Sequence, residues 1–166
     1  MFVLGIDPGL SATGYGLVEA RGIRLRAVAA GAIRTSPASG DAARLAELFA
    51  DLEALFAEYH PDEMAVEQVF VNRNLQTATQ VGRAVGVTLL AAARAGVPVF
   101  EYTPSAVKMA VTGSGDAAKD RVQALVARRL GLAGAPRPAD AADALAVAIC
   151  HLQSAGLRRA VAEAGR

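Results

Sequence analysis

Short apolar runs separated by polar breaks fill the first part of the chain, in a pattern typical of β-strands. Residues 2–7, 13–20 and 23–34 are rich in aliphatic side chains, and the third run partly alternates between apolar and charged positions. Arg21 and Gly22 form the expected tight turn between the last two runs. The pattern therefore predicts three consecutive antiparallel strands.

The pattern then changes to alternating helices and strands. After residue 40, apolar residues recur at helical spacing, with Asp41 as the expected N-cap and Pro61 just beyond the helix end. Further helices are expected over about 75–95, from Thr103, from Asp116 or Ala117 to about Leu130, and from Ala139 to roughly Gln153, with strands over 63–68 and 97–102.

This order of elements predicts an α/β fold of the ribonuclease-H-like type. Three antiparallel strands followed by two parallel ones give a five-stranded mixed sheet, and right-handed crossovers place helices on both faces. The length fits one domain over residues 1–155, with residues 156–166 as a frayed tail.

Composition excludes several classes of protein. The apolar fraction is 53%, but much of it is alanine, and the longest apolar stretch, residues 85–93, is too short to span a bilayer. No basic segment followed by an apolar one marks a signal peptide. The single cysteine, Cys150, excludes an internal disulfide and fits a buried thiol in a reducing compartment. We therefore expect a cytoplasmic protein without membrane association.

The net charge is only +1, but the charges are unevenly distributed. Residues 40–67 are mostly acidic, whereas residues 73–137 are mostly basic. Such asymmetry fits a basic surface that binds nucleic acid, although solvated helix faces would give the same pattern.

Two acidic residues stand at the ends of apolar strands. Asp7 follows the first strand and precedes Pro8-Gly9, and Glu67 ends the strand over residues 63–68. Asp7 alone is equally compatible with a hydrogen bond to the following turn. Because ligand sites collect at the carboxyl ends of strands, we expect the two strands to be neighbours and the two acids to be close.

Asp140 and Asp143 lie three residues apart on one face of the last helix. Acids near a helix N-terminus also favour the helix dipole, which is an alternative explanation for Asp140 in particular. If all four acids converge, their mutual repulsion requires a cation. We expect Mg²⁺, with two ions per subunit and Mn²⁺ as a possible substitute, because hard cations prefer carboxylate oxygens.

The chain contains only two lysines, Lys108 and Lys119, although arginine is common. They flank the glycine-containing loop over residues 113–115. A lysine ammonium is a compact charge that binds phosphate well, but chance could equally produce two lysines in these positions.

Taken together, four segments resemble the RuvC Holliday-junction resolvases in order and spacing. They are Gly5-Ile6-Asp7-Pro8-Gly9 with Thr13-Gly14-Tyr15-Gly16, Val66-Glu67-Gln68-Val69-Phe70, Val107-Lys108 with Gly113-Ser114-Gly115 and Ala118-Lys119, and Asp140-Ala141-Ala142-Asp143-Ala144-Leu145-Ala146. Each motif alone is weak, but the combination is specific and covers about residues 2–152.

The resemblance implies a homodimeric endonuclease that resolves four-way DNA junctions during recombination and repair. It implies paired nicking of two strands of like polarity by divalent-metal-activated water, leaving 5′-phosphate and 3′-hydroxyl ends. It also implies cooperation with the RuvA–RuvB branch-migration complex.

By position, the resemblance assigns Asp7, Glu67, Asp140 and Asp143 as catalytic metal ligands and Lys108 and Lys119 as basic residues near the scissile phosphate. Phe70 corresponds to an aromatic residue that contacts bases at the junction centre, and Arg73, in the same predicted loop, is a further DNA-binding candidate.

Gly82 and Gly86, one turn apart in a long helix, suggest close approach of another backbone, within the chain or across a dimer. Arg83, between Gly82 and Ala84, departs from the family's pattern, in which a polar uncharged residue is expected more often, and this leaves details of the dimer interface or of DNA contact open.

Two other functions remain as alternatives. The segment from Asp7 to Gly14 also resembles the phosphate loop of actin-like ATPases and sugar kinases, but those enzymes need two lobes and the chain is about one lobe long. A catalytically inactive DNA-binding module of the same fold is the second alternative, and the four retained acids argue against it.

Overall fold

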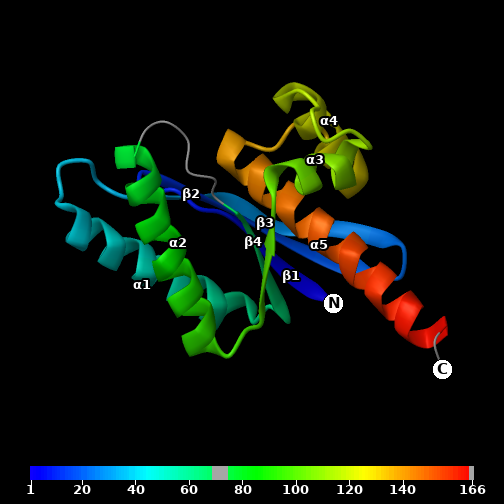
Figure 1. Cartoon of the computed structure of the whole chain (residues 1–166), viewed down its shortest axis with the longest axis horizontal. Helices are drawn as coiled ribbons and strands as arrows, with labels where there is room; N and C mark the ends of the chain where they lie inside the picture. The colour runs from blue at the N-terminus through cyan, green and yellow to red at the C-terminus, as the bar shows by residue number, and fades with distance from the viewer. Residues whose placement is uncertain (69–74, 165–166) are drawn as a thin grey trace.

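The computed structural model describes residues 1–68 and 75–164, without the side chains of residues 157–164. Phe70 and Arg73 lie outside the described residues. The strands are β1 (Phe2–Asp7), β2 (Ala12–Arg21), β3 (Arg24–Arg34), β4 (Glu63–Glu67) and β5 (Val99–Tyr102). The helices are α1 (Asp41–Tyr59), α2 (Leu75–Ala95), α3 (Pro104–Thr112), α4 (Lys119–Leu130) and α5 (Ala139–Ala164) (Figure 1).

The strands form one five-stranded mixed sheet in the order β3-β2-β1-β4-β5. β1 pairs antiparallel with β2 and parallel with β4, and β4 pairs parallel with β5. This arrangement confirms the predicted mixed sheet, and it places the two acid-bearing strands, β1 and β4, side by side.

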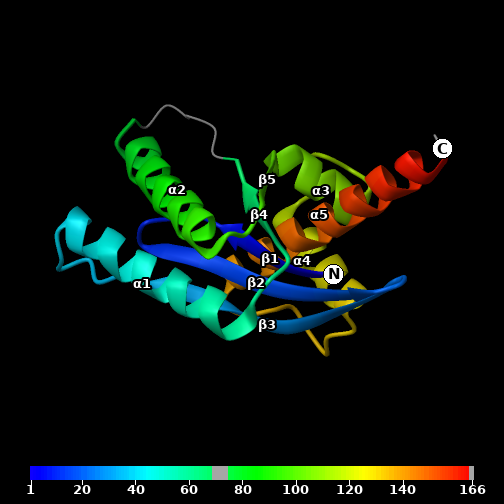
Figure 2. The ribbon, with the colours of Figure 1, turned by 90° about the horizontal axis from the view of Figure 1, so that it is seen from below.

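Helices cover both faces of the sheet, as the pattern predicts (Figure 2). On one face, Leu4, Ile6 and Leu17 pack with the apolar sides of α1 and α2. On the other face, Val3 and Val18 pack with α3, α4 and α5. The alternation of neighbouring residues between the two faces is the period-two pattern of a strand buried on both sides.

Helix α5 lies unusually close to β1 and β2 because glycines form the floor beneath it. A Cβ atom added to Gly14 would lie 2.1 Å from the carbonyl oxygen of Asp140, and one added to Gly5 would lie 2.1 Å from that of Ala144. A Cβ atom added to Gly16 would lie 2.7 Å from the side chain of Leu145 and 2.8 Å from its backbone nitrogen. Any side chain at these positions would push the helix away from the sheet.

A buried polar cluster fastens α5 to the sheet farther along the helix. His151 is fully buried, and its Nδ1 atom lies 2.8 Å from the hydroxyl of Tyr102 on β5. Its Nε2 atom contacts the carboxylate of Glu63 on β4. Both ring nitrogens thus have a partner, as burial of a polar ring requires.

Several predicted boundaries shift. The turn between β2 and β3 is Gly22–Ile23, and Gly22 takes the positive φ of 59° that glycine tolerates. Gly40 rather than Asp41 is the N-cap of α1. Asp41 is the first residue of the helix, and its carboxylate pairs with Arg83. Helix α4 begins at Lys119. Asp116 lies in the preceding loop, where its carboxylate accepts a hydrogen bond from the Ser114 hydroxyl.

The last helix is longer than the expected end near Gln153, and the frayed tail over residues 156–166 stays a prediction. Helix α5 continues to Ala164. Gly156 is the only helix-weakening residue in this stretch, and the residues after it are mostly good helix formers that carry the helix onward. The extent of the single domain stays a prediction.

Gly82 and Gly86 do not contact another backbone within the described residues, because a Cβ atom at either position would meet nothing within 4 Å. The explanation by close approach within the chain therefore finds no support in residues 1–68 and 75–164. The explanation by a dimer stays a prediction. None of the helices in the described part of the chain has the length and hydropathy needed to cross a membrane.

We predict that Gly14→Ala destabilises the protein by roughly 3 kcal/mol, because its methyl group overlaps the Asp140 carbonyl and the backbone of α5 must move. Urea denaturation followed by circular dichroism measures the change. Gly134→Ala, in a loop where an added Cβ meets nothing within 4 Å, is the control and should change stability by less than about 0.5 kcal/mol. Equal stability of the two variants would contradict the role of the glycine floor.

Candidate active site

Two acids meet at one edge of the sheet. Asp7 is the last residue of β1 and Glu67 the last of β4, and these strands run parallel with Ile6 opposite Val66. The two carboxylates therefore leave the sheet from neighbouring strand ends. The predicted proximity of Asp7 and Glu67 is confirmed.

The close packing of α5 on Gly5, Gly14 and Gly16 brings two further acids to the same edge of the sheet. Gly14, over which the Asp140 backbone lies, is the cross-strand partner of Asp7 in the β1–β2 register. Asp140 and Asp143 occupy the first two turns of α5, so that close approach brings both toward the strand ends. The helix N-terminus also favours their negative charge.

Two lysines stand over this edge from the neighbouring helices. Lys119, the first residue of α4, places its Nζ atom 2.7 Å from Oδ2 of Asp143. Lys108 comes from α3, and a cleft of about 230 Å³ opens between α3, α4, α5 and the end of β4. Its polar walls are Glu67, Lys108, Lys119 and Asp143, and its apolar walls are Pro104, Val107, Val122 and Ala146.

The charges of the acids influence one another strongly. Burial, followed by the charges of Glu67, Asp143 and Asp140, raises the pKa of Asp7 to about 7, against a smaller opposing effect of Lys119. Burial and Asp143 also raise the pKa of Glu67, while Lys108 and Lys119 act in the opposite direction. The hydrogen bond to Asp143 raises the pKa of Lys119. The structure thus brings the four predicted acids and the two lysines into one electrostatic cluster.

The donor set suits a hard divalent cation. Within the described residues, no three His, Cys, Asp or Glu side chains are close enough together to hold one ion by themselves. Mg²⁺ characteristically takes one or two carboxylates and completes its shell with water and substrate phosphate. Pairs of carboxylates beside an open cleft therefore fit Mg²⁺ better than a closed all-protein site. His151, bonded to Glu63 and Tyr102, belongs to a different cluster and offers no zinc site here.

One charged neighbour of the site was not predicted. Arg34 at the end of β3 places Nη2 3.8 Å from Oδ2 of Asp140. No periodicity or motif points to this contact, because it depends on how α5 crosses the sheet and not on local sequence. The contact is largely exposed, so its attraction is weakened by solvent.

Comparison with known proteins places this site in a family. The sequence profile of the family described as crossover junction endodeoxyribonuclease RuvC matches residues 3–151. The chain is 56% identical over 154 residues to the RuvC of Heliobacterium modesticaldum, covering 93% of this chain and 95% of the relative. It is 51% identical to the RuvC of Moorella thermoacetica over 167 residues, covering 100% of both chains.

Solved structures agree with this relationship. The Thermus thermophilus RuvC structure is 40% identical, with a TM-score of 0.87 and coverage of 95% of this chain and 96% of that chain. The T. thermophilus RuvC in complex with Holliday junction substrate is also 40% identical, with a TM-score of 0.89 and coverage of 93% and 94%. The fold is shared more distantly by the yeast mitochondrial Holliday junction resolvase Ydc2, at 13% identity and a TM-score of 0.63 over 89% of this chain and 77% of that chain.

Profile, relatives and structures all cover nearly the whole chain, including the strand-end acids and the first turns of α5. The chain therefore belongs to the RuvC family of crossover junction endodeoxyribonucleases.

Proposed function

We propose that this protein resolves four-way DNA junctions by metal-dependent, paired nicking of two strands of like polarity in recombination and repair. The observation that carries the proposal is the cluster of Asp7, Glu67, Asp140 and Asp143 beside a cleft lined by Lys108 and Lys119. The T. thermophilus relative bound to Holliday junction substrate supports the choice of DNA.

The four acids would hold Mg²⁺, two ions per subunit, with Mn²⁺ as an alternative. When bound, the cations supply Lewis acidity that favours attack by water and departure of the 3′ oxygen, which leaves 5′-phosphate and 3′-hydroxyl ends. Lys119 and Lys108 face the same cleft and would hold the non-bridging oxygens of the scissile phosphate. Lys119 must exchange Asp143 for phosphate to do so, and its exposure makes that exchange possible.

We extend the proposal to partners. A homodimer with two-fold symmetry matches the symmetry of two cuts in one junction. Gly82 and Gly86, exposed on α2 with open space above them, leave room for the backbone of a second subunit. Phe70 would stack on an unpaired base at the junction centre, with Arg73 nearby on the phosphate backbone. The protein would work with RuvA–RuvB in the cytoplasm, where its DNA substrate lies.

The decisive experiment incubates the protein with a labelled four-way junction, a linear duplex and a flap, with and without Mg²⁺. Symmetric cuts in the junction alone, only with Mg²⁺, are the expected result. Equal cutting of all three substrates would contradict junction selectivity. Binding without cutting would instead favour the inactive DNA-binding module, and tight ATP binding would favour an actin-like ATPase.

We predict that Asp7→Asn abolishes Mg²⁺-dependent nicking while junction binding persists, measured by gel assays of cleavage and binding. Because the raised pKa makes the folded state hold more protons than the unfolded chain, the wild-type carboxylate destabilises the metal-free fold increasingly as pH rises from about 4 to about 7, and the penalty is constant above that. The variant should therefore be more stable without metal at pH 8, by up to about 4 kcal/mol, because each unit of pKa corresponds to about 1.4 kcal/mol. Retained cleavage would contradict the assignment of Asp7.

We predict that Lys119→Ala slows single-turnover cleavage roughly tenfold to a hundredfold, because it removes a cation from the cleft and leaves Asp143 without that partner. Rapid-quench measurement with saturating enzyme in excess over the junction gives the rate. Arg128→Ala, an exposed arginine near the other end of α4, is the matched control and should leave this rate unchanged. The same slowing in both variants would reduce Lys119 to a general surface charge.

We predict that the apparent affinity for Mg²⁺ falls as pH drops below about 7, because Asp7 must lose its proton to bind the ion. The decrease should approach about tenfold per pH unit for one competing proton. Mg²⁺ titrations at several pH values between about 6 and 8 give the half-saturating Mg²⁺ concentration, by calorimetry as well as by cleavage. A constant affinity across this interval would show that Asp7 is ionised throughout it.

A further inference from the structure

Arg44 on α1 is a buried cation whose charge is poorly balanced by carboxylates. Its side chain is only 9% exposed, and its ion pair with Asp41 is long, at 4.0 Å. Burial of a guanidinium is costly unless hydrogen bonds satisfy it. The contacts of Arg44 therefore indicate what the buried charge does.

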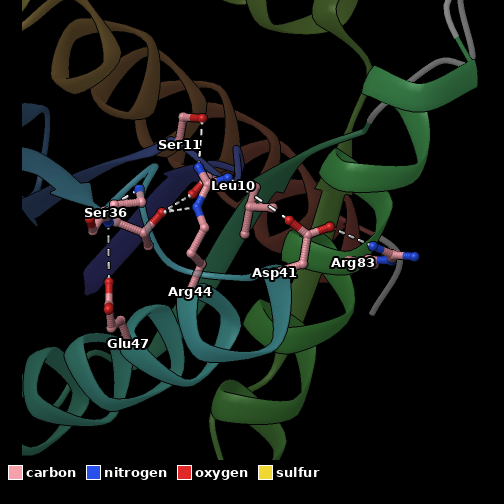
Figure 3. Close-up of polar contacts among 9 residues, drawn as sticks. Leu10, Ser11, Ser36, Asp41, Arg44, Glu47 and Arg83 are labelled. Atoms are coloured by element: carbon pink, nitrogen blue, oxygen red, sulfur yellow. Dashed lines mark hydrogen bonds and ion pairs between the residues drawn. The ribbon is translucent and has the colours of Figure 1, made fainter.

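Those contacts reach two segments outside α1, one of them 33 residues before Arg44 (Figure 3). Nη2 donates to the hydroxyl of Ser11 over 2.8 Å, and Nε donates to the hydroxyl of Thr35 over 2.9 Å. Thr35, itself buried, donates its hydroxyl to the carbonyl of Leu10 over 2.6 Å. One side chain thus joins the start of α1, the end of β3 and the turn over residues 8–11.

The turn held in this way comes directly after Asp7. On its other side, the hydroxyl of the fully buried Thr13 donates to the carbonyl of Gly9 over 2.7 Å. The turn is therefore fixed from two directions, by β2 through Thr13 and by α1 through Arg44. Any loosening of it would displace the end of β1, where the Asp7 carboxylate leaves the sheet.

A second ion pair connects this cluster to α2. Asp41, the neighbour of Arg44, places Oδ2 2.7 Å from Nη1 of Arg83 (Figure 3). The guanidinium of Arg44 is enclosed by protein, which does not suit a residue that contacts DNA directly. A positioning role fits its burial and its partners better.

We propose that Arg44 is a positioning residue, which holds the turn over residues 8–11 and thereby the Asp7 carboxylate in its working place. This inference rests on the proposed function for the role of Asp7. In this view, the contacts of Arg44 with Ser11 and Thr35 influence the rate of the reaction as well as the stability of the fold.

The first test measures the turn directly, in metal-free protein. Hydrogen–deuterium exchange of residues 8–13 is compared in the wild type, Arg44→Met, Arg44→Lys and Ser11→Ala. Leu52→Ala, a core variant of the same helix, is the control for general destabilisation. We expect exchange roughly tenfold faster in Arg44→Met and a few-fold faster in Ser11→Ala, with Arg44→Lys between them because lysine cannot form the forked contact. Leu52→Ala should change the turn no more than the rest of the molecule.

The second test measures cleavage of a four-way junction at saturating enzyme. A displaced Asp7 should lower the single-turnover rate of Arg44→Met by up to about a hundredfold while the junction dissociation constant stays unchanged. Arg94→Met is the matched control, because Arg94 also pairs with α1, through Glu53 at 3.0 Å, but far from the turn. Its rate should equal that of the wild type.

The outcomes separate the two proposals. Faster exchange with a slower rate in Arg44→Met and Ser11→Ala, beyond any effect in Leu52→Ala, supports the positioning role. Unchanged exchange in the turn, or faster exchange with an unchanged rate, overturns it. If Arg44→Met does not fold, Ser11→Ala alone decides. If the wild type leaves the junction uncut, the proposed function fails, while Mg²⁺-induced thermal stabilisation of the same variants still decides the positioning role.

Discussion

The close approach of α5 to the strands β1 and β2 is the constraint on which the site depends. Gly5, Gly14 and Gly16 remove the side chains that would otherwise separate the helix from the sheet. Only at that short distance does the first turn of α5 lie over the strand pair that ends in Asp7. The His151 cluster then fixes the helix farther along, so its direction across the sheet is set at two places.

This geometry has an electrostatic cost that the fold tolerates. Burial and neighbouring carboxylates disfavour the charged form of Asp7, which raises its pKa. Lys119, Lys108 and Arg34 reduce the repulsion without removing it. A site that is destabilised in this way favours cation binding, because the ion relieves repulsion already present in the folded protein. Stability is thus given up locally where the chemistry needs concentrated charge.

The sequence supports the prediction of much of this arrangement because the relevant signals are local. Asp7 and Glu67 each end an apolar run, and Asp140 and Asp143 have the spacing of one helix face. Helix α2 has the predicted bounds, since its apolar periodicity is continuous. The paired strands could then be ordered from the general rules for parallel sheets.

The rest depends on contacts between distant segments, for which no local signal exists. The bonds from Arg44 to Ser11 and Thr35 span 33 and 9 residues, and a sequence shows only an arginine on a helix. The prediction of Asp41 as the N-cap of α1 fails for a similar reason, because the Asp41 carboxylate forms an ion pair with Arg83 on another helix. Gly14 and Gly16 are part of a motif in the sequence, but the sequence does not show that a helix packs against them.

The packing of α5 also explains why small residues are frequent on its buried face. Ala141, Ala144 and Ala148 are buried on α5, and the larger aliphatic residues Leu145 and Ile149 are buried beside them. Gly5 lies against Ala144 and Ala148, where α5 is too close to the sheet for a larger side chain, whereas Leu145 extends over Gly16. The alanines at these two positions of α5 therefore reflect the short distance between two layers of the molecule. A larger side chain at Ala144 or Ala148 would move α5 away from Gly5, and the carboxylates of Asp140 and Asp143 would move with the helix.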